Sequence, residues 1–167
     1  MKKTLSLVIG TLFGIGFIKK MPGTMASISI AIVWYFIPEY FFYNPVENVI
    51  FYDRYLYLFL FLIGFSYLSA HICKVCEEHF GNDAKEIVID EVIGYLFAVL
   101  FLPKTLIVAI YALVLFRIFD ITKPFFIGKL QSVKGGWGVI LDDIAAGITS
   151  NIIILLLFFI KPKFFMM

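Results

Sequence analysis

The feature that most constrains the fold of this chain is its set of four long apolar segments. They cover residues 24–38, 50–73, 92–116 and 139–160. Hydrophobic residues make up 62% of the chain and charged residues 16%, whereas soluble domains average about 45–50% and about 25%. A chain of 167 residues is long enough for one domain and hardly for two. The sequence therefore predicts a single membrane domain over residues 1–167.

Length and proline limit what each segment can form. Segments 50–73 and 139–160 reach the ~20 residues that a helix needs to cross a bilayer, whereas Pro38 ends the first segment early. Pro103 interrupts the third segment because proline cannot continue the helical hydrogen-bond ladder, and Lys104 is costly at the bilayer centre. We expect two shorter helices there, folded into a hairpin at Pro103–Lys104. The predicted fold class is an all-α, polytopic membrane helical bundle of about four membrane segments, one of them a broken hairpin.

The positions of the lysines and arginines predict the orientation in the membrane. With the hairpin topology, ten of the 14 lie on one side and four on the other. Cytoplasmic loops carry an excess of Lys and Arg, so the side with ten is predicted to face the cytoplasm. A single helix across 92–116 would divide these charges almost evenly. Basic pairs also flank the N-terminal apolar stretch, which is typical of a short interfacial helix and not of a cleaved signal peptide.

Acidic residues gather on the predicted cytoplasmic side. Asp90 and Glu91 precede the third apolar segment, and Asp142 and Asp143 lie at the start of the fourth. The helix dipole favours a carboxylate at a helix start by about 0.3–1 kcal/mol. That effect explains one exposed carboxylate, but it does not account for four, nor for Asp120 at the opposite end of a helix.

Small residues at helical spacing predict that the acidic helices approach one another closely. Gly94 follows Asp90 by four residues, and Gly147 follows Asp143 by four, so each glycine shares a helix face with a carboxylate. Carboxylates that converge repel one another unless a cation joins them. Oxygen ligands favour Mg²⁺, Mn²⁺ or Ca²⁺.

Basic residues near the same face are candidate anion binders. They are Arg117, Lys123, Lys134 and Lys20. Arg117 and Asp120 are three residues apart and share a helix face, and Asp120 can reach Lys123 by the same step. The glycine-rich run at 133–138 precedes a helix and could cradle a phosphate, although such turns are common. Thr24, at another helix start, either caps that helix or contacts the phosphate. Acidic and basic groups at a lipid–water boundary indicate phosphoryl chemistry on a lipid head group.

Four sequence blocks resemble the phosphatidylglycerophosphatase A family. They are MPGT at 21–24, IVIDEVIG at 87–94, FRIFDITKP at 116–124 and KGGWGVILDDIAAG at 134–147. Their order and spacing agree with the family from about residue 10 to 160. The chain departs from the family pattern at Phe126, where a proline is expected, and matches it only loosely at 81–86, which includes Asp83.

The resemblance implies Mg²⁺-dependent hydrolysis of phosphatidylglycerophosphate to phosphatidylglycerol and inorganic phosphate, in phospholipid biosynthesis. It implies a bacterial inner-membrane enzyme, here with its active site facing the cytoplasm and a lipid as its substrate. The implied metal ligands are Asp90, Glu91, Asp142 and Asp143. Asp120 joins these four as a catalytic residue, either as a ligand or by orienting Arg117. Together with the candidate anion binders named above, the predicted substrate-binding residues are Arg117, Lys123, Lys134, Thr24 and Lys20.

Other readings make different predictions. A small transporter or channel could use the acidic cluster as a cation site, but the polar residues gather at one face and no inverted repeat is found. A scaffold subunit would show no metal dependence. His71, Cys73, Cys76 and His79 suggest zinc or redox chemistry, with helix packing as the simpler explanation. A net charge of +2 without a long basic run argues against nucleic acid. The pattern leaves open the oligomeric state, the number of metal ions, and direct water attack against a phospho-enzyme.

Overall fold

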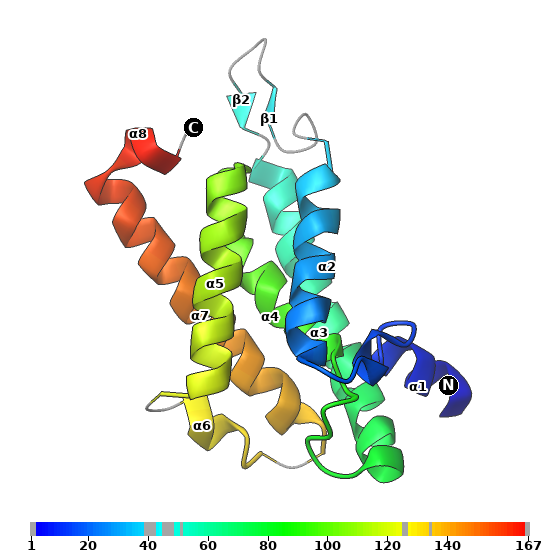
Figure 1. Ribbon diagram of the computed structural model, residues 1–167. Helices are drawn as coiled ribbons and strands as arrows, with labels where there is room; N and C mark the ends of the chain where they lie inside the picture. Colours follow the sequence, from blue (N-terminus) through cyan, green and yellow to red (C-terminus); the bar gives the residue numbers. More distant parts are fainter. Residues whose placement is uncertain are drawn as a thin grey trace.

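The computed structural model describes residues 3–38, 43–44, 49–50, 52–124, 127–133 and 135–165, and this part of the chain is almost entirely helical (Figure 1). The helical elements are α1 (Lys3–Gly10), η1 (Ile15–Phe17), α2 (Pro22–Phe36), α3 (Tyr52–Phe80), α4 (Ile89–Val99), α5 (Leu106–Thr122), α6 (Ile127–Leu130), α7 (Trp137–Ile160) and α8 (Pro162–Phe165). A two-residue antiparallel ladder of β1 (Tyr43–Asn44) and β2 (Val49–Ile50) precedes α3. The predicted all-α class is confirmed.

Helix α4 forms the centre of the bundle. It contacts α2, α3, α5 and α7, and nine of its eleven residues are buried. Its most extensive contacts are with α7. The short helix α1 lies at the side of the bundle against α3 (Figure 1). Because α4 is enclosed on several sides, the acidic residues in its first turn are carried into the interior.

Two glycines allow α4 and α7 to cross in close contact. A Cβ atom added to Gly147 would lie 2.2 Å from the carbonyl oxygen of Gly94. A Cβ atom added to Gly94 would lie 2.4 Å from the ring of Phe116 and 2.9 Å from the carbonyl oxygen of Asp143. Any larger residue would force the helices apart, so the predicted close approach of these helices is confirmed.

The third apolar segment is broken where proline predicted a break. Helix α4 ends at Val99 and α5 begins at Leu106, and the two helices pack against each other. Asn151 of α7 donates hydrogen bonds to the carbonyl oxygens of Phe97, Ala98 and Leu100, the last at 2.7 Å. These bonds satisfy carbonyl groups that a helix end leaves without partners.

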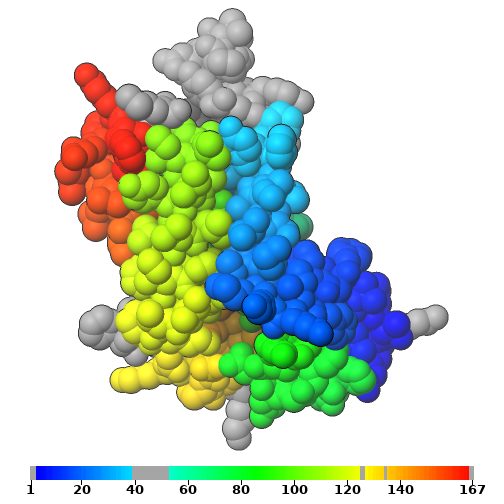
Figure 2. All heavy atoms as spheres, viewed as in Figure 1, coloured from blue at the N-terminus to red at the C-terminus, as the bar shows by residue number. Residues whose placement is uncertain are grey.

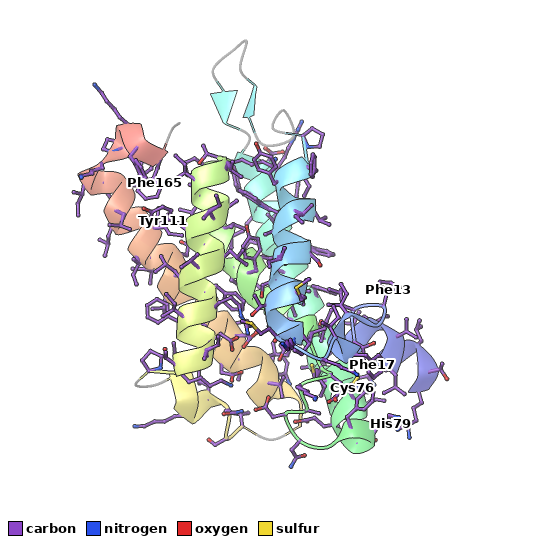
Figure 3. All side chains as sticks on the ribbon, viewed as in Figure 1. Phe13, Phe17, Cys76, His79, Tyr111 and Phe165 are labelled. Atoms are coloured by element: carbon purple, nitrogen blue, oxygen red, sulfur yellow. The ribbon has the colours of Figure 1, made fainter. Side chains whose placement is uncertain are left out.

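The end of the bundle that carries this break is held by a second contact. The Thr105 hydroxyl accepts a bond from the Val108 N–H at 3.2 Å and donates one to the Phe165 carbonyl at 3.0 Å. The rings of Tyr111 and Phe165 pack edge to face, with centroids 5.3 Å apart (Figure 3). Helix α8 is thereby attached to the start of α5.

Two helices of the described chain are long and apolar enough to cross a membrane, residues 53–80 and α7. The other predicted segments form shorter helices: α2 has 15 residues, α4 has 11 and α5 has 17. The prediction of about four membrane segments is therefore supported for two of them. The starts of α2, α4 and α7 and the end of α5 meet at one end of the bundle, the lower end in Figure 1.

Candidate functional site

Three carboxylates from two helices meet inside the lower end of the bundle. Asp90 and Glu91 lie in the first turn of α4, and Asp143 lies near the start of α7. One oxygen from each side chain lies within 4.8 Å of the others. Asp90 is 8% exposed and Asp143 is 3% exposed. The close crossing at Gly94 and Gly147 sets this arrangement, since it holds the two acidic turns side by side.

Each of the three carboxylates has an oxygen that no group of the described protein satisfies. These buried atoms are Asp90 Oδ1, Glu91 Oε2 and Asp143 Oδ2. Buried polar atoms normally find a partner, and an exception calls for an explanation. A set of carboxylate oxygens at this spacing fits a hard divalent cation, which takes oxygen ligands and offsets their mutual repulsion.

The electrostatics of α4's first turn agree with that fit. Burial raises the pKa of Asp90 well above its ordinary value, and the charge of Glu91 raises it further. Burial also raises the pKa of Glu91, which the charge of Arg117 only partly opposes. Without a cation, the three carboxylates cannot all be charged at low cost. A bound divalent cation would reverse that balance.

Arg117 connects the acidic cluster to α5. Its Nη1 atom donates to Asp120 Oδ2 at 2.5 Å and lies 3.6 Å from Glu91 Oε1. The predicted pairing of Arg117 and Asp120 along one helix face is confirmed. The Nε atom of Arg117 is buried and has no hydrogen-bond partner. Asp120 therefore holds the Arg117 guanidinium group, whose Nε–H has no partner in the described protein. A role of Asp120 as a metal ligand stays a prediction.

Lys123 pairs across the bundle with Asp142, and no pairing with Asp120 is observed. Its Nζ atom lies 2.5 Å from Asp142 Oδ2. Lys123 is the C-cap of α5 and has a left-handed backbone, with φ of 41°, so its side chain leaves the face that Asp120 occupies. Burial lowers the pKa of Lys123, but the bond to Asp142 and its charge outweigh this and raise the pKa.

Asp142 and Asp143 are neighbours in sequence but face different surroundings. Successive residues on an α-helix point about 100° apart. Asp143 faces Asp90 and Glu91, whereas Asp142 is 2% exposed and faces Lys123. The other oxygen of Asp142, Oδ1, accepts a bond from the N–H of Asp143 at 3.2 Å. Asp142 is thus outside the group of three, and its predicted role as a metal ligand stays a prediction.

The start of α2 closes over the cluster. A Cβ atom on Gly23 would lie 1.8 Å from Glu91 Oε1 and 3.1 Å from Arg117 Nη1. The sequence gives no physical reason for this glycine, because a contact between α2 and α4 leaves no trace in local spacing. Helix α2 takes Met21 as its N-cap with no side-chain cap bond, and the hydroxyl of Thr24 is buried without a partner. The capping role considered for Thr24 is not observed.

Two predicted phosphate binders lie apart from this arrangement. Lys20 is exposed in the loop before α2, and no ion pair of it is seen within the described residues. Lys134 lies outside the described residues. Of the neighbouring glycines, Gly136 is the N-cap of α7 with φ of 76°, and a Cβ atom there would lie 2.2 Å from the Ala70 carbonyl oxygen. Packing against α3 therefore explains this glycine without a phosphate.

A cavity of about 520 Å³ opens beside the start of α7. Polar groups of Glu77, Asn82, Asp83 and Gln131 line it together with Gly138 and Val139. Gln131 donates a hydrogen bond to Asp83, which joins the 81–86 loop to the loop before α7. Local sequence patterns do not predict this hydrogen bond, because its partners are 48 residues apart.

The cysteines and histidines of α3 do not converge. Cys73 and Cys76 are buried and free, whereas His71 and His79 are exposed. Cys76 Sγ donates to the Ser6 carbonyl at 3.5 Å, and the ring of His79 packs on Phe80 with centroids 4.8 Å apart. Figure 3 places Cys76 and His79 in the part of α3 beside α1. The positions agree with helix packing.

Comparisons with known proteins identify relatives along nearly the whole chain. The family model described as phosphatidylglycerophosphatase A matches residues 8–158. A Bacteroides thetaiotaomicron protein, provisionally named phosphatidylinositol-3-phosphatase, is 33% identical over 155 residues, which cover 90% of this chain and 91% of the relative. Phosphatidylglycerophosphatase A of Escherichia coli is 32% identical over 141 residues, which cover 83% of this chain and 74% of the relative. No solved structure matches.

Proposed function

The chain belongs to the phosphatidylglycerophosphatase A family and is a lipid phosphatase of that type, and we propose that it hydrolyses phosphatidylglycerophosphate to phosphatidylglycerol and inorganic phosphate with Mg²⁺. The observation that carries the proposal is the group of Asp90, Glu91 and Asp143, three converging carboxylates that each keep an unsatisfied buried oxygen. Such a group beside a fixed arginine suits hydrolysis of a phosphate monoester.

Asp90, Glu91 and Asp143 are the residues that would hold Mg²⁺. When bound, Mg²⁺ polarises a phosphoryl oxygen and lowers the pKa of a water. The protein's own contribution is to bring the three carboxylates together in a buried site and to exclude bulk water around them. Either one or two ions are compatible with this proposal.

Arg117 and Thr24 are proposed to hold the phosphoryl group. Asp120 fixes the guanidinium of Arg117, whose Nε–H stays free to donate to a phosphate oxygen. The buried hydroxyl of Thr24 is a second donor without a partner. Donors that are fixed before the reaction stabilise charge on the transferring group without reorganisation. Gly23 allows the start of α2, which carries Thr24, to pack against Glu91.

Lys123 is proposed to bind the phosphate in partnership with Asp142. The ion pair keeps Lys123 protonated, and its charge lies next to the acidic cluster. The polar cavity lined by Val139 lies about one turn before Asp142 on α7, and we propose it as the route by which water reaches the site. Lys20 and Lys134 stay predictions as further contacts to the head group.

The location is proposed to be the bacterial inner membrane, with several membrane segments and the site facing the cytoplasm. Two sufficiently long apolar helices, the excess of basic residues on one side, and the family support this. The carboxylates gather at one end of the bundle, which favours the enzyme over a transporter or channel with a cation path through the membrane.

The test is phosphate release by the purified protein in detergent from three lipids: phosphatidylglycerophosphate, phosphatidic acid and phosphatidylinositol 3-phosphate. We expect release from the first lipid that EDTA abolishes and Mg²⁺ restores, with the other two giving much lower kcat/KM. Higher kcat/KM on phosphatidylinositol 3-phosphate would instead assign the activity named for the Bacteroides relative. Absence of release from every lipid by the folded protein would overturn the proposal.

A further inference from the structure

An apolar groove of about 190 Å³ runs between α2 and α5. These two helices lie side by side on the face of the molecule shown in Figure 2. The side chains that form the walls are Ile28, Ile32 and Tyr35 from α2, and Leu106, Ile110 and Leu113 from α5. The groove is smaller than the roughly 300–1,000 Å³ that encloses a whole small molecule, so it accommodates part of a larger ligand.

Two alanines leave room for the groove. Ala31 and Ala109 lie between its walls and are only 9% and 5% exposed. Larger side chains at these positions would fill the space between α2 and α5. At the end of the groove near Tyr35 and Leu106, Lys104 donates a hydrogen bond to the Tyr35 carbonyl oxygen and holds the hairpin turn against α2.

The helix faces that form the groove walls also carry the proposed phosphate-binding residues. On α2, Thr24, Ile28 and Ile32 follow one another at steps of four residues. On α5, Leu113 precedes Arg117 by four residues. Residues four apart lie above one another on the same helix face. The residues that we assign to phosphate binding therefore lie one helical turn beyond the last wall residues, Ile28 and Leu113.

Polar atoms without partners lie one helical turn beyond this end of the groove. Thr24 Oγ1 and Arg117 Nε are both buried, and neither has a hydrogen-bond partner in the described protein. Both can donate to a phosphate oxygen. The groove thus combines an apolar channel with two unsatisfied donors at one end, which is the pattern that a phospholipid matches.

The distance from the proposed phosphate site to the far end of the groove agrees with an acyl chain of one leaflet. From Thr24 to Phe36 the helix advances twelve residues, or roughly 18 Å at 1.5 Å per residue. Half of the hydrocarbon core of a bilayer is about 15 Å. A chain in the groove would therefore extend from the phosphate site towards the bilayer centre.

We propose that the α2–α5 groove binds one acyl chain of the phospholipid substrate while Arg117 and Thr24 hold its phosphate. The inference rests on the proposed lipid phosphatase site and adds where the lipid lies. A lipid in this position enters laterally from the membrane, between α2 and α5. The hydrogen-bond donors of the site, Arg117 and Thr24, then bind its phosphate. A substrate without long chains uses the phosphate site alone.

Tryptophan substitutions at the groove mouth test the proposal kinetically. Ile32 and Ile110 are 53% and 50% exposed, so Ile32→Trp and Ile110→Trp add bulk to the groove without entering the core. For a phosphatidylglycerophosphate with two oleoyl chains, we expect KM to rise about five- to tenfold with kcat within about twofold, as loss of uniform binding requires. For the dihexanoyl substrate, KM should change much less. Ile152→Trp on α7 is the matched control, because Ile152 is 51% exposed and lies outside the groove.

Photolabelling with phosphatidylglycerophosphate that carries a diazirine in one acyl chain gives a readout independent of turnover. We expect the label mainly in α2 and α5, and a loss of that label in Ile110→Trp but not in Ile152→Trp. Label spread equally over the exposed faces of α3 and α7, or equal KM changes for long and short chains, would overturn the groove. Normal phosphate release together with evenly spread label would refute the acyl-chain groove but not the proposed phosphatase activity. Label concentrated in α2 and α5 without any phosphate release would refute the proposed phosphatase activity but not the acyl-chain groove.

Discussion

The acidic cluster and the ion pair beside it both contain buried carboxylates, but their negative charge is compensated differently. Asp143 and Asp142 are consecutive residues of α7, and both are almost fully buried. Asp142 is neutralised by Lys123 from α5. Asp143 joins two further carboxylates and keeps an unsatisfied oxygen. The protein supplies the counter-charge for Asp142. For Asp90, Glu91 and Asp143 it supplies only Arg117, beside Glu91, and we propose that a cation from solution supplies the rest.

The largest effect should follow removal of a member of the acidic cluster. Asp143→Asn should lower Mg²⁺-dependent phosphate release by about a thousandfold, the loss expected when a metal's several kcal/mol of transition-state stabilisation is removed. The Mg²⁺ concentration for half-maximal activity should also rise. A titration of phosphate release against Mg²⁺ measures both.

Asp53→Asn is the control for this variant, since Asp53 is exposed at the start of α3. Full turnover with unchanged Mg²⁺ dependence in Asp143→Asn would show that Asp143 is not needed for metal binding, and the proposed difference between Asp143 and Asp142 would be wrong. The same result in Asp142→Asn would exclude only the predicted metal role of Asp142.

Gly23→Ala should have the next largest effect. The added methyl group would lie 1.8 Å from Glu91 Oε1, so Glu91 or the start of α2 must move. Misplacement of a reacting group by about 1 Å can cost about a hundredfold in rate, and we expect a loss of kcat of that order. Gly64→Ala on α3 is the matched control, because no atom lies near its Cβ position. Equal kcat in both variants would show that the contact of Gly23 with Glu91 is not needed.

Arg117→Lys tests whether the guanidinium is needed as a planar donor. Lysine keeps the positive charge near Glu91 but loses the fork that allows simultaneous contact with Asp120 and a phosphate oxygen. We expect kcat/KM to fall by about tenfold or more, with Mg²⁺ half-saturation nearly unchanged. A large rise in the Mg²⁺ requirement would instead place Arg117 in support of the metal ligands.

Lys123→Met should affect stability more than metal binding. It leaves Asp142, 2% exposed, without its counter-charge, and breaking such a pair destabilises by about 3 kcal/mol at the lower end of measured losses. Thermal unfolding in detergent should show a lowered Tm, and the double variant Lys123→Met with Asp142→Leu should recover part of it. If Lys123→Met raised the Mg²⁺ requirement as much as Asp143→Asn, the separation of the pair from the cluster would fail.

Features that depend on local chemistry could be predicted from the sequence. Pro103 predicted the break between α4 and α5 because proline lacks the N–H that a helix requires. Gly94 and Gly147 predicted a close helix crossing, and the three-residue step from Arg117 to Asp120 predicted their pairing. Each inference needs only the residue type and the 3.6-residue period.

Features that depend on helix rotation and long-range contacts could not be predicted. Spacing placed Asp143 on the helix face of Gly147, but it did not exclude Asp142 from the implied ligands. The rotation of α7 against α4 and α5 decides that Asp143 meets Asp90 and Glu91 and that Asp142 meets Lys123. The left-handed backbone at Lys123 sends that side chain to Asp142. The contact of Gly23 with Glu91 joins residues 68 positions apart.

The sequence by itself determined the helical class, the break in the third apolar segment, the family, and the set of charged residues from which a site can be built. These follow from hydropathy, proline chemistry and helical periodicity, which act over a few residues. The tertiary structure decided which carboxylates converge, which one pairs with a lysine, and where an apolar groove forms between α2 and α5. Those outcomes follow from the packing of helices that are distant in sequence, because each helix can present only one face to a given neighbour.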